Sequence, residues 1–437
     1  MLRTIDLRGR TLSAAELLAA VPRATAAREE ALTTAAALVQ DVAREGEEAL
    51  RRQAERFDGV SDHAVRVPAS HLSEALAALS PDVRGALEEA IRRVRLASAA
   101  QVPSPVVTDL GEGALVMQRW QPVRRVGVYV PGGKAVYPSS VVMNVVPAQV
   151  AGVREVALAS PPQREYDGRV HPVILAAAHL LGVTEVYAMG GAGAIGAFAH
   201  GVDSVGLSPV DVVSGPGNNF VAAAKRAVAG RVGTDSEAGA TEILIVADDS
   251  ADPRLVAADL ISQAEHDEQA AAVLVTASSA LVDAVNAELA MRAPLTMHAE
   301  RVAEAFAGPQ SAIILVDDLQ TATDVSNAYA PEHLELHLAD PRPGDFVHAG
   351  AVFVGDHSPV SLGDYLAGSN HVLPTGGQAR YAPGLSAATF LRPQQVIEYT
   401  RDALAEVRQQ IVTLANAEVL PAHGEAVEAR FELDARH

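Results

Sequence analysis

Gln263 and His266 are two side chains whose types and spacing could begin a metal site. They end a segment that reads as a helix from about Pro253, and residues three apart lie on one face of a helix. A carboxamide oxygen and an imidazole nitrogen would then lie side by side. The pair alone fits a solvated helix surface better, because amide and charged side chains mostly cover such surfaces. A metal site therefore requires further donors.

Further donors occur in three later segments. These are PEHLELH at 331–337, GDYLAGSNH at 363–371 and AEVLPAH at 417–423. Asp364 and His423 bring the set to two imidazole nitrogens and two oxygens, which suits zinc or another borderline divalent ion better than calcium. Singly, each residue also has an ordinary explanation. Asp364 could cap a helix after Gly363, and His371 could be a hydrogen-bonded core histidine.

Glu332 and His333, which directly follow Pro331, are the candidate acid and base pair. At a loop or a helix start, both side chains can face one cavity. A histidine with a near-neutral pKa can take a proton from an alcohol, and a carboxylate can deprotonate water. The pair therefore suits an oxidation followed by a hydration. The ordinary alternative is a capping glutamate beside a partly exposed histidine.

Composition limits the classes of function. The chain has 437 residues, 49% of them hydrophobic, and is long enough for two or more globular domains. Acidic residues outnumber basic ones by 54 to 34, a formal charge of -20. No basic footprint for a phosphate backbone is present, so we expect no nucleic acid partner. The absence of cysteine excludes disulfides, a thiolate zinc site and a thiol nucleophile.

The sequence predicts a cytoplasmic protein with no membrane partner. Arg8, Arg10 and Glu16 interrupt the apolar core that a signal peptide would need near the N-terminus. The longest apolar run, at 173–183, contains His179 and is shorter than the roughly 20 residues that a membrane span requires.

The expected fold is α/β, with two Rossmann-like α/β domains built on parallel-rich sheets. Short aliphatic runs alternate with helical runs from Val126 to about Gly239, and a similar alternation follows from Thr241. This pattern is typical of parallel strands with covering helices. A small N-terminal segment and a helical C-terminal segment complete the chain. The predicted boundaries are 1–23 for the N-terminal segment, 24–128 with 241–385 for the first domain, 129–240 for the second domain and 386–437 for the C-terminal tail.

Two glycine motifs lie in the predicted second domain. Gly191-Ala-Gly193-Ala-Ile-Gly196 satisfies the G-x-G-x-x-G pattern between a predicted strand and a predicted helix, and GPGNN at 215–219 precedes another helix. Such turns can present backbone N–H groups to phosphate. The alternative is that the glycines are required only by tight turns.

Several motifs together resemble the histidinol dehydrogenase family. They are VGVYVPGG, SGPGN, the segment from Asp235 to Glu242, LISQAEH, APEHLEL, GDYLAGSNHVLPTGG and AEVLPAH, all in the family's order between about residues 30 and 425. The resemblance implies a zinc-dependent enzyme that oxidises L-histidinol to L-histidine through histidinaldehyde and reduces two NAD, the last step of histidine biosynthesis.

The resemblance also implies roles for individual residues. His333 would be the base for the alcohol and hydride steps, and Glu332 would activate the water. Substrate contacts would come from Thr241, His371, Glu418, His333 and the zinc ligands. The implied zinc ligands are Gln263, His266, Asp364 and His423, and the implied NAD contacts are Tyr129 and Asn218. In the family the last histidine comes from the partner subunit, which implies a homodimer that exchanges its C-terminal tails, with His423 and Glu418 contributed to the other subunit's site.

Two departures from the family pattern bear on coenzyme binding. Gly193 stands where the family commonly has Gln, an amide that helps hold NAD, and Ala240-Thr241 stands where Pro-Ser or Pro-Thr is usual. A loop without proline is less restricted. Two alternatives therefore stay open: a related zinc and NAD dehydrogenase of another primary alcohol, and a non-catalytic zinc-binding relative.

Overall fold

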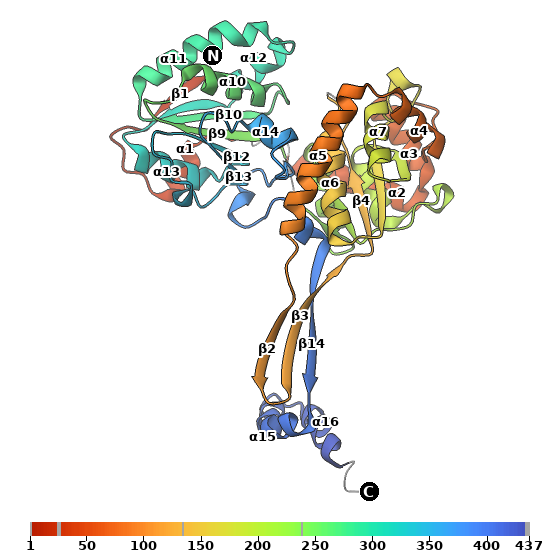
Figure 1. Ribbon diagram of the computed structural model, residues 1–437. Coiled ribbons are helices and arrows are strands. Elements are labelled where there is room, and N and C mark those ends of the chain that lie inside the picture. The colour runs from red at the N-terminus through yellow and green to blue at the C-terminus, as the bar shows by residue number, and fades with distance from the viewer. Residues whose placement is uncertain (1, 24–27, 133–134, 237–238, 433–437) are drawn as a thin grey trace. The chain divides into compact units, whose positions relative to one another are not determined.

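The chain folds into two compact units (Figure 1). In the computed structural model, the described residues are 2–23, 28–132, 135–236 and 239–432. The main unit comprises Met1–Val102 and Val123–Phe390, and the second unit comprises Pro103–Pro122 and Leu391–His437. Each unit is thus assembled from two separate stretches of the chain.

Six parallel strands form the first sheet of the main unit, in the order β1-β11-β10-β9-β12-β13. Their bounds are Arg3–Asp6 (β1), Glu242–Ala247 (β9), Ala271–Thr276 (β10), Ala312–Leu315 (β11), His333–His337 (β12) and Ala351–Val354 (β13). Strands β9, β10 and β11 are nearly continuous aliphatic runs, as expected where helices cover both faces of a parallel sheet. The predicted α/β class is confirmed.

Helices cover both faces of this first sheet (Figure 1). One face carries α10 (Pro253–Ala264), α11 (Ser279–Arg292) and α12 (Ala299–Ala307), and the other carries α1 (Ala14–Ala20) and α13 (Leu319–Tyr329). Side chains alternate between the faces of a strand, so Ile243 joins the core under α10 and Leu244 joins the core beside α13. His333, Glu335 and His337 of β12 share the register of Ile243 and therefore face α10.

Five parallel strands form the second sheet of the main unit, in the order β6-β5-β4-β7-β8. Their bounds are Arg125–Tyr129 (β4), Glu155–Ser160 (β5), Glu185–Ala188 (β6), Val212–Ser214 (β7) and Gly233–Thr234 (β8). The helices between them are α6 (Pro138–Ala151), α7 (Pro172–Leu180), α8 (Gly191–His200) and α9 (Asn219–Val228). The predicted alternation of strands and helices is confirmed, and its first strand begins a few residues before the predicted boundary at 129.

The helices of the N-terminal quarter pack on the second sheet. α2 (Arg28–Glu45) contacts α8 and α9, α4 (Ala69–Ala78) contacts α7, and α5 (Pro81–Ala100) contacts α6. Ala31, Ala35 and Val39 form the buried stripe of α2 and share one core with Ile195. The assignment of residues 24–128 to the first domain is therefore wrong for these helices. Residues 1–23 are not a separate segment either, because β1 is the edge strand of the first sheet.

Helix starts follow the capping signals in the sequence. Ser80 accepts a hydrogen bond from the Val83 N–H, and Pro81 is the first residue of α5. α10 likewise starts at Pro253 after the capping residue Asp252. None of the helices in the described part of the chain combines the length and the hydropathy needed to cross a bilayer.

The second unit contains an antiparallel sheet followed by two helices. The sheet has the order β14-β3-β2, with bounds Val106–Gly111 (β2), Ala114–Pro122 (β3) and Leu391–Tyr399 (β14), and the helices are α15 (Arg401–Ala417) and α16 (Pro421–Glu432). β14 pairs with β3 over its whole length. The prediction that 386–437 is helical throughout is therefore wrong for β14, whose partner strand lies more than 250 residues earlier in the chain.

Candidate active site

The predicted catalytic and metal-binding residues of the main unit gather at the amino ends of two neighbouring strands. Thr241 directly precedes β9, and Glu332 directly precedes β12. The last turn of α10, with Gln263, reaches the same edge, since Gln263 is hydrogen-bonded to Thr241. Open α/β sheets more often bind ligands at the carboxyl ends of their strands. In this sheet the polar residues lie instead at the amino ends of the strands.

Glu332 is buried, and its carboxylate is held in place by two donors. Oε2 accepts hydrogen bonds from Thr241 Oγ1 at 2.6 Å and from the Glu242 N–H at 2.9 Å. Burial raises the pKa of Glu332 above its ordinary value, although the His333 imidazole and the two donors oppose this shift. The carboxylate is thus oriented by the chain and made a stronger base than an exposed glutamate.

His333 begins β12 and is buried beside Glu332. Its Nδ1 lies 3.1 Å from the Glu242 carbonyl oxygen and 3.5 Å from Glu332 Oε2. A carbonyl oxygen only accepts hydrogen bonds, so Nδ1 carries the proton and donates it. The lone pair is then on Nε2, which is the nitrogen that can act as a base. The pair stands at the start of a strand, one of the irregular positions where two adjacent side chains can meet.

Thr241 connects Gln263 to Glu332. Gln263 Nε2 donates a hydrogen bond to Thr241 Oγ1 at 2.8 Å, and that hydroxyl donates to Glu332. The amide nitrogen of Gln263 is therefore engaged, and its carbonyl oxygen lies outside this hydrogen bond. That oxygen is the atom through which an amide binds a metal ion.

His266 does not share a helix face with Gln263. α10 ends at Ala264, Glu265 is its C-terminal cap, and His266 lies in the turn that follows. The prediction of two ligands on one helix face is therefore wrong in its geometry. The turn still brings the ring close to α14 (Val360–Tyr365), because His266 Nε2 lies 3.9 Å from Asp364 Oδ2.

Asp364 lies inside α14, and Pro359 occupies the capping position of that helix. The backbone carbonyl of Asp364 accepts a hydrogen bond from His371 Nδ1 at 2.9 Å, and His371 Nε2 lies 3.2 Å from Ser140 Oγ. Burial lowers the pKa of His371, although the Asp364 carboxylate opposes the shift. His371 is thus a neutral, hydrogen-bonded imidazole beside the other predicted site residues.

The two remaining predicted ligands belong to the second unit. Glu418 is the C-terminal cap of α15, and His423 lies in the first turn of α16. Both side chains are exposed. The main unit thus brings together seven of the predicted residues: Thr241, Gln263, His266, Glu332, His333, Asp364 and His371.

The predicted NAD contacts lie at helix starts beside the second sheet. Tyr129 ends β4, and its hydroxyl accepts a hydrogen bond from the Gly191 N–H at 3.1 Å, at the first residue of α8. Burial raises the pKa of Tyr129 to about 12, so the phenol stays neutral. Asn218 caps α9 and accepts hydrogen bonds from the Phe220 and Val221 N–H groups at 3.0 and 3.2 Å.

The glycines of the G-x-G-x-x-G motif serve helix packing. A Cβ atom on Gly193 would lie 2.4 Å from Gln53 Oε1, and one on Gly196 would lie 3.1 Å from the Val39 Cα atom. Both glycines are inside α8 and let other helices approach it closely. This observation favours the backbone explanation of the motif over a nucleotide fingerprint.

Sequence reasoning missed Asp58, the last residue of the π-helical segment η1 (Ala54–Asp58). Burial raises the pKa of Asp58 to about 6, and its charge influences the buried Tyr129. A Cβ atom on Gly190 would lie 3.4 Å from Asp58 Oδ2. An isolated aspartate after a helix carries no motif, so no sequence signal pointed to it.

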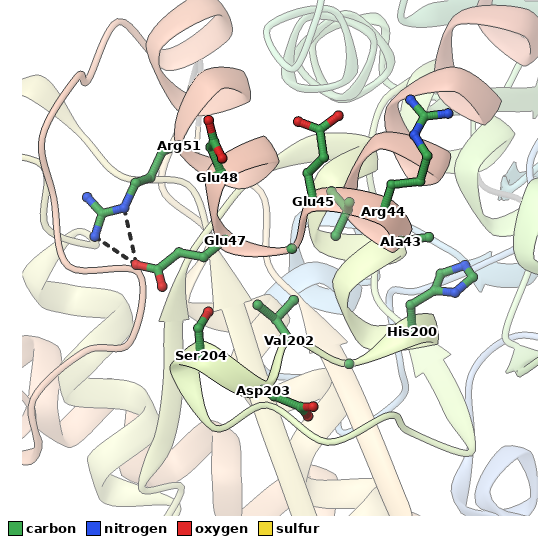
Figure 2. Close-up of a pocket in the computed structure, with 13 residues that line it drawn as sticks. Ala43, Arg44, Glu45, Glu47, Glu48, Arg51, His200, Val202, Asp203 and Ser204 are labelled. Carbon is green, nitrogen blue, oxygen red and sulfur yellow. Dashed lines mark hydrogen bonds and ion pairs between the residues drawn. The ribbon is translucent and has the colours of Figure 1, made fainter.

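An open pocket of about 740 Å³ lies away from these residues (Figure 2). It is bordered by the turn between α2 and α3 (Glu47–Gln53) and by the segment after α8. Its wall includes an ion pair between Arg51 and Glu47 with a separation of 2.8 Å. It contains none of the predicted site residues, and we assign no function to it.

Comparisons with known proteins relate the chain to one enzyme family. The family model described as histidinol dehydrogenase matches residues 21–431. The chain belongs to the histidinol dehydrogenase family. A relative from Leifsonia xyli subsp. xyli named histidinol dehydrogenase is 64% identical over 435 residues, 99% of each chain. One of the same name from Mycobacterium tuberculosis is 57% identical over 437 residues, 99% of this chain and 98% of the relative.

A solved histidinol dehydrogenase also has this fold. The crystal structure of histidinol dehydrogenase from Elizabethkingia anophelis matches with a TM-score of 0.91 and 30% sequence identity, over 99% of this chain and 98% of that one. The family resemblance drawn from the motifs is thereby confirmed for nearly the whole chain.

Proposed function

We propose that this chain oxidises L-histidinol to L-histidine through histidinaldehyde and reduces two NAD, the final step of histidine biosynthesis. The observation that carries the proposal is the buried pair of Glu332 and His333, joined to the candidate ligand Gln263 through Thr241. Relatives named histidinol dehydrogenase at 64% and 57% identity over nearly the full length support the same activity. Location in the cytoplasm stays a prediction.

The donor set at the amino ends of β9 and β12 fits a zinc ion. His266 Nε2 and Asp364 Oδ2, 3.9 Å apart, are too distant for a hydrogen bond and close to the separation of two ligands of one ion. Gln263 adds its amide oxygen, and we assign the fourth position to His423. When bound, zinc supplies a Lewis acid for the alcohol oxygen, and NAD supplies the hydride acceptor.

His333 and Glu332 divide the proton transfers between them. His333 Nε2 takes the proton of the histidinol hydroxyl group, and a hydride leaves the carbon that carries this group. The product of these two steps is the aldehyde. Glu332 then takes a proton from water as the water oxygen attacks the aldehyde carbon. Loss of a second hydride and of the remaining hydroxyl proton from the resulting gem-diolate gives the carboxylate. The two hydrides carry the four electrons, and water supplies the second carboxylate oxygen.

Substrate recognition is proposed for Thr241, His371 and Glu418. His371 is neutral because burial lowers its pKa, so it offers a hydrogen bond without placing a second charge beside the metal ligands. Tyr129 and Asn218 are the proposed NAD contacts, from the end of β4 and the start of α9.

We further propose a homodimer in which the second unit completes the partner's site. His423 and Glu418 are exposed in the second unit. Large apolar side chains there are also exposed, as expected for a surface that another subunit covers. They include Val106, Val107, Leu110, Ile397, Leu414 and Val419.

The stoichiometry of NADH formed per L-histidinol consumed tests the proposed function. We expect two NADH per substrate, with activity lost on chelation and restored by zinc. One NADH per substrate would indicate an alcohol dehydrogenase that stops at the aldehyde. No NADH, in a folded chain loaded with zinc, would favour a non-catalytic zinc-binding relative.

A further inference from the structure

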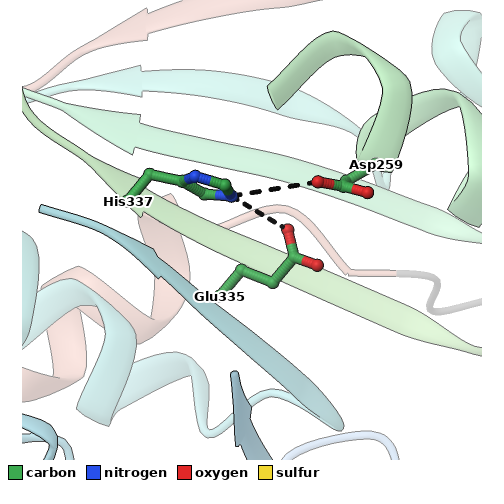
Figure 3. Close-up of side chains that lie close together, drawn as sticks. All are labelled: Asp259, Glu335 and His337. Atoms are coloured by element: carbon green, nitrogen blue, oxygen red, sulfur yellow. Dashed lines mark ion pairs between the residues drawn. The ribbon is translucent and has the colours of Figure 1, made fainter. Parts of the chain in front are cut away.

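Three side chains form a second cluster of metal-binding groups beside the first sheet (Figure 3). Glu335 and His337 point from β12 toward α10, and Asp259 points back from α10. One ligand atom from each residue lies within 4.8 Å of the others. Glu335 and His337 follow His333 by two and four residues, which is about 7 and 13 Å along a strand. The cluster is therefore separate from the candidate active site.

The separations between His337 and the two carboxylates of the cluster are longer than ordinary hydrogen bonds. His337 Nε2 lies 3.5 Å from Glu335 Oε2 and 3.8 Å from Asp259 Oδ2, whereas N–H···O bonds are about 2.7–3.2 Å long. Metal–ligand bonds of about 2.0–2.2 Å in a tetrahedral site place neighbouring ligands roughly 3.3–3.6 Å apart. The separation of His337 from Glu335 lies in this range, and its separation from Asp259 is slightly longer.

Buried polar atoms of Glu335 and His337 also lack hydrogen-bond partners. Glu335 is 1% exposed, and its Oε2 makes no hydrogen bond, while its Oε1 accepts one from the Val360 N–H at 2.8 Å. His337 is 5% exposed, and its Nδ1 makes none. Each unsatisfied buried group costs about 1–3 kcal/mol. The Glu335 oxygen points into the cluster and indicates a ligand there.

The charges of the cluster favour a cation as that ligand. Two carboxylates accompany one imidazole, and His337 is the only basic group among the described residues that pairs with Asp259 or Glu335. Two ionised carboxylates in this position are therefore costly unless a positive charge accompanies them. A divalent ion balances both.

We propose that Asp259, Glu335 and His337 bind a divalent cation of the zinc or manganese class, distinct from the ion of the candidate active site. One nitrogen and two carboxylate oxygens suit these ions better than calcium, which takes more oxygen ligands. The carboxylate of Asp356 lies beside the other ring nitrogen of His337, with Oδ1 3.5 Å from Nδ1. The side chain of Asp356 is 59% exposed, whereas that of Asp259 is 15% exposed.

The ion would tie β12 to the helices that carry the candidate zinc ligands. Asp259 precedes Gln263 by about one turn of α10, and Glu335 holds the first N–H of α14, which carries Asp364. The expected role is therefore to position these helices without touching substrate. This role rests on the proposed function, whereas the ion site itself rests on the cluster alone.

Metal content per chain tests the proposal. The full-length protein is exposed to excess Zn²⁺, or to Mn²⁺ in a second series, freed of weakly bound ions and assayed by mass spectrometry. We expect two zinc ions per chain in the unaltered protein and one in Asp259→Asn, Glu335→Gln or His266→Asn. The double variant Asp259→Asn/His266→Asn should bind none. Asp249→Asn is the matched control, because it removes an exposed carboxylate near the same sheet and should leave both ions.

The number of metal ions per chain distinguishes a failure of this proposal from a failure of the proposed function. One ion in His266→Asn that disappears when Asp259→Asn is added supports the cluster, whether or not the enzyme turns over histidinol. The same ion should raise the thermal midpoint of the His266→Asn chain and leave that of the double variant unchanged. Failure of His266→Asn to bind either metal, or unchanged ion counts in folded Asp259→Asn and Glu335→Gln, would overturn the proposal. The cluster would then be held by shared protons.

Discussion

At the residue scale, a single hydroxyl group joins the candidate ligand Gln263 to the candidate base Glu332. Thr241 accepts from the amide and donates to the carboxylate through the same oxygen. We propose that Thr241 contacts substrate, and its hydrogen bonds in the structure are to these two side chains. Thr241 is therefore also a positioning residue for Glu332.

Thr241→Val tests this positioning role. Loss of a hydrogen bond to a charged group is worth about 1.5–3 kcal/mol, so we expect the rate of NADH formation to fall about 10- to 100-fold. Thr241→Ser keeps the hydroxyl and is the matched control, with a rate within a few-fold of the original. Steady-state assays with saturating L-histidinol measure both. Equal rates for the two variants would contradict the role.

The buried Asp58 predicts a pH dependence of stability. Its pKa is raised from 3.8 to about 6 in the folded chain, so between these values the native state binds more protons than the unfolded state. Stability from this group is therefore fully present below pH 4 and is lost as pH rises through 6. The full shift corresponds to about 3 kcal/mol, and partial solvent exposure reduces the expectation to about 1 kcal/mol.

Asp58→Asn isolates that contribution. As the pH rises from 4 to 6.5, the thermal midpoint of the unaltered chain should decrease by more than that of Asp58→Asn. Asp62→Asn, which changes an exposed carboxylate nearby, should behave like the unaltered chain. Identical pH profiles for all three chains would show that Asp58 does not titrate in this range.

At the element scale, a buried ion pair holds the loop before α9. Lys225 and Asp235 are both 2% exposed and form an ion pair. Lys225 Nζ also donates to the Gly215 carbonyl at 2.6 Å, and Asp235 Oδ2 accepts from the Gly215 N–H at 2.8 Å. The pair thereby fixes both backbone groups of Gly215 in the loop that leads to the candidate NAD contact Asn218.

Asp235→Ala should destabilise the main unit by about 3–5 kcal/mol, because it leaves the Lys225 ammonium buried and unpaired. The double variant Lys225→Met/Asp235→Leu removes both charges and should lose less stability than Asp235→Ala. Urea unfolding followed by circular dichroism measures the difference. A double variant less stable than Asp235→Ala would contradict the explanation.

Local patterns predicted the elements, but not which elements lie together. Aliphatic runs correctly predicted strands β4 to β7 and β9 to β13, and the helix expected from about Pro253 is α10, but the edge strands β1 and β8 were not predicted. The pattern also carried no information on which sheet α2 covers. β14 was missed because its strand conformation depends on pairing with β3.

In the candidate site, too, local features were predictable from the sequence and long-range contacts were not. Glu332 and His333 stand together in the sequence, so their proximity was predictable, and motif resemblance supplied Gln263 and Asp364. The Asp259, Glu335 and His337 cluster was not predicted, because Asp259 lies more than 70 residues before β12 in the sequence. Their meeting depends on the parallel pairing of β9 with β12.

At the scale of the whole molecule, the proposed homodimer gives each zinc site residues from two subunits. A chain with His423→Asn lacks the donor that it gives to its partner, and a chain with His266→Asn lacks one of its own. Mixing the two variants under conditions of subunit exchange should produce mixed dimers with one intact site. We expect up to about a quarter of the original activity after random reassortment, measured as NADH formation.

Two controls define that experiment. Each variant alone should stay inactive, and His298→Asn, outside the proposed site, should stay active in every mixture. No recovery of activity, despite exchange shown by differently tagged subunits, would mean that one chain supplies both residues of its own site.

The pairing of β1 with β11 has a consequence for the order in which the protein is made. Arg3 lies opposite Ala312 in the first sheet, so the first strand to leave the ribosome waits for one made some 300 residues later. At about 5–20 residues per second, that wait is roughly 15–60 s. The second sheet, in contrast, is encoded within one continuous stretch from β4 to β8. We therefore expect a nascent chain stalled near residue 280 to protect this stretch from protease while its N-terminal strand is still cleaved.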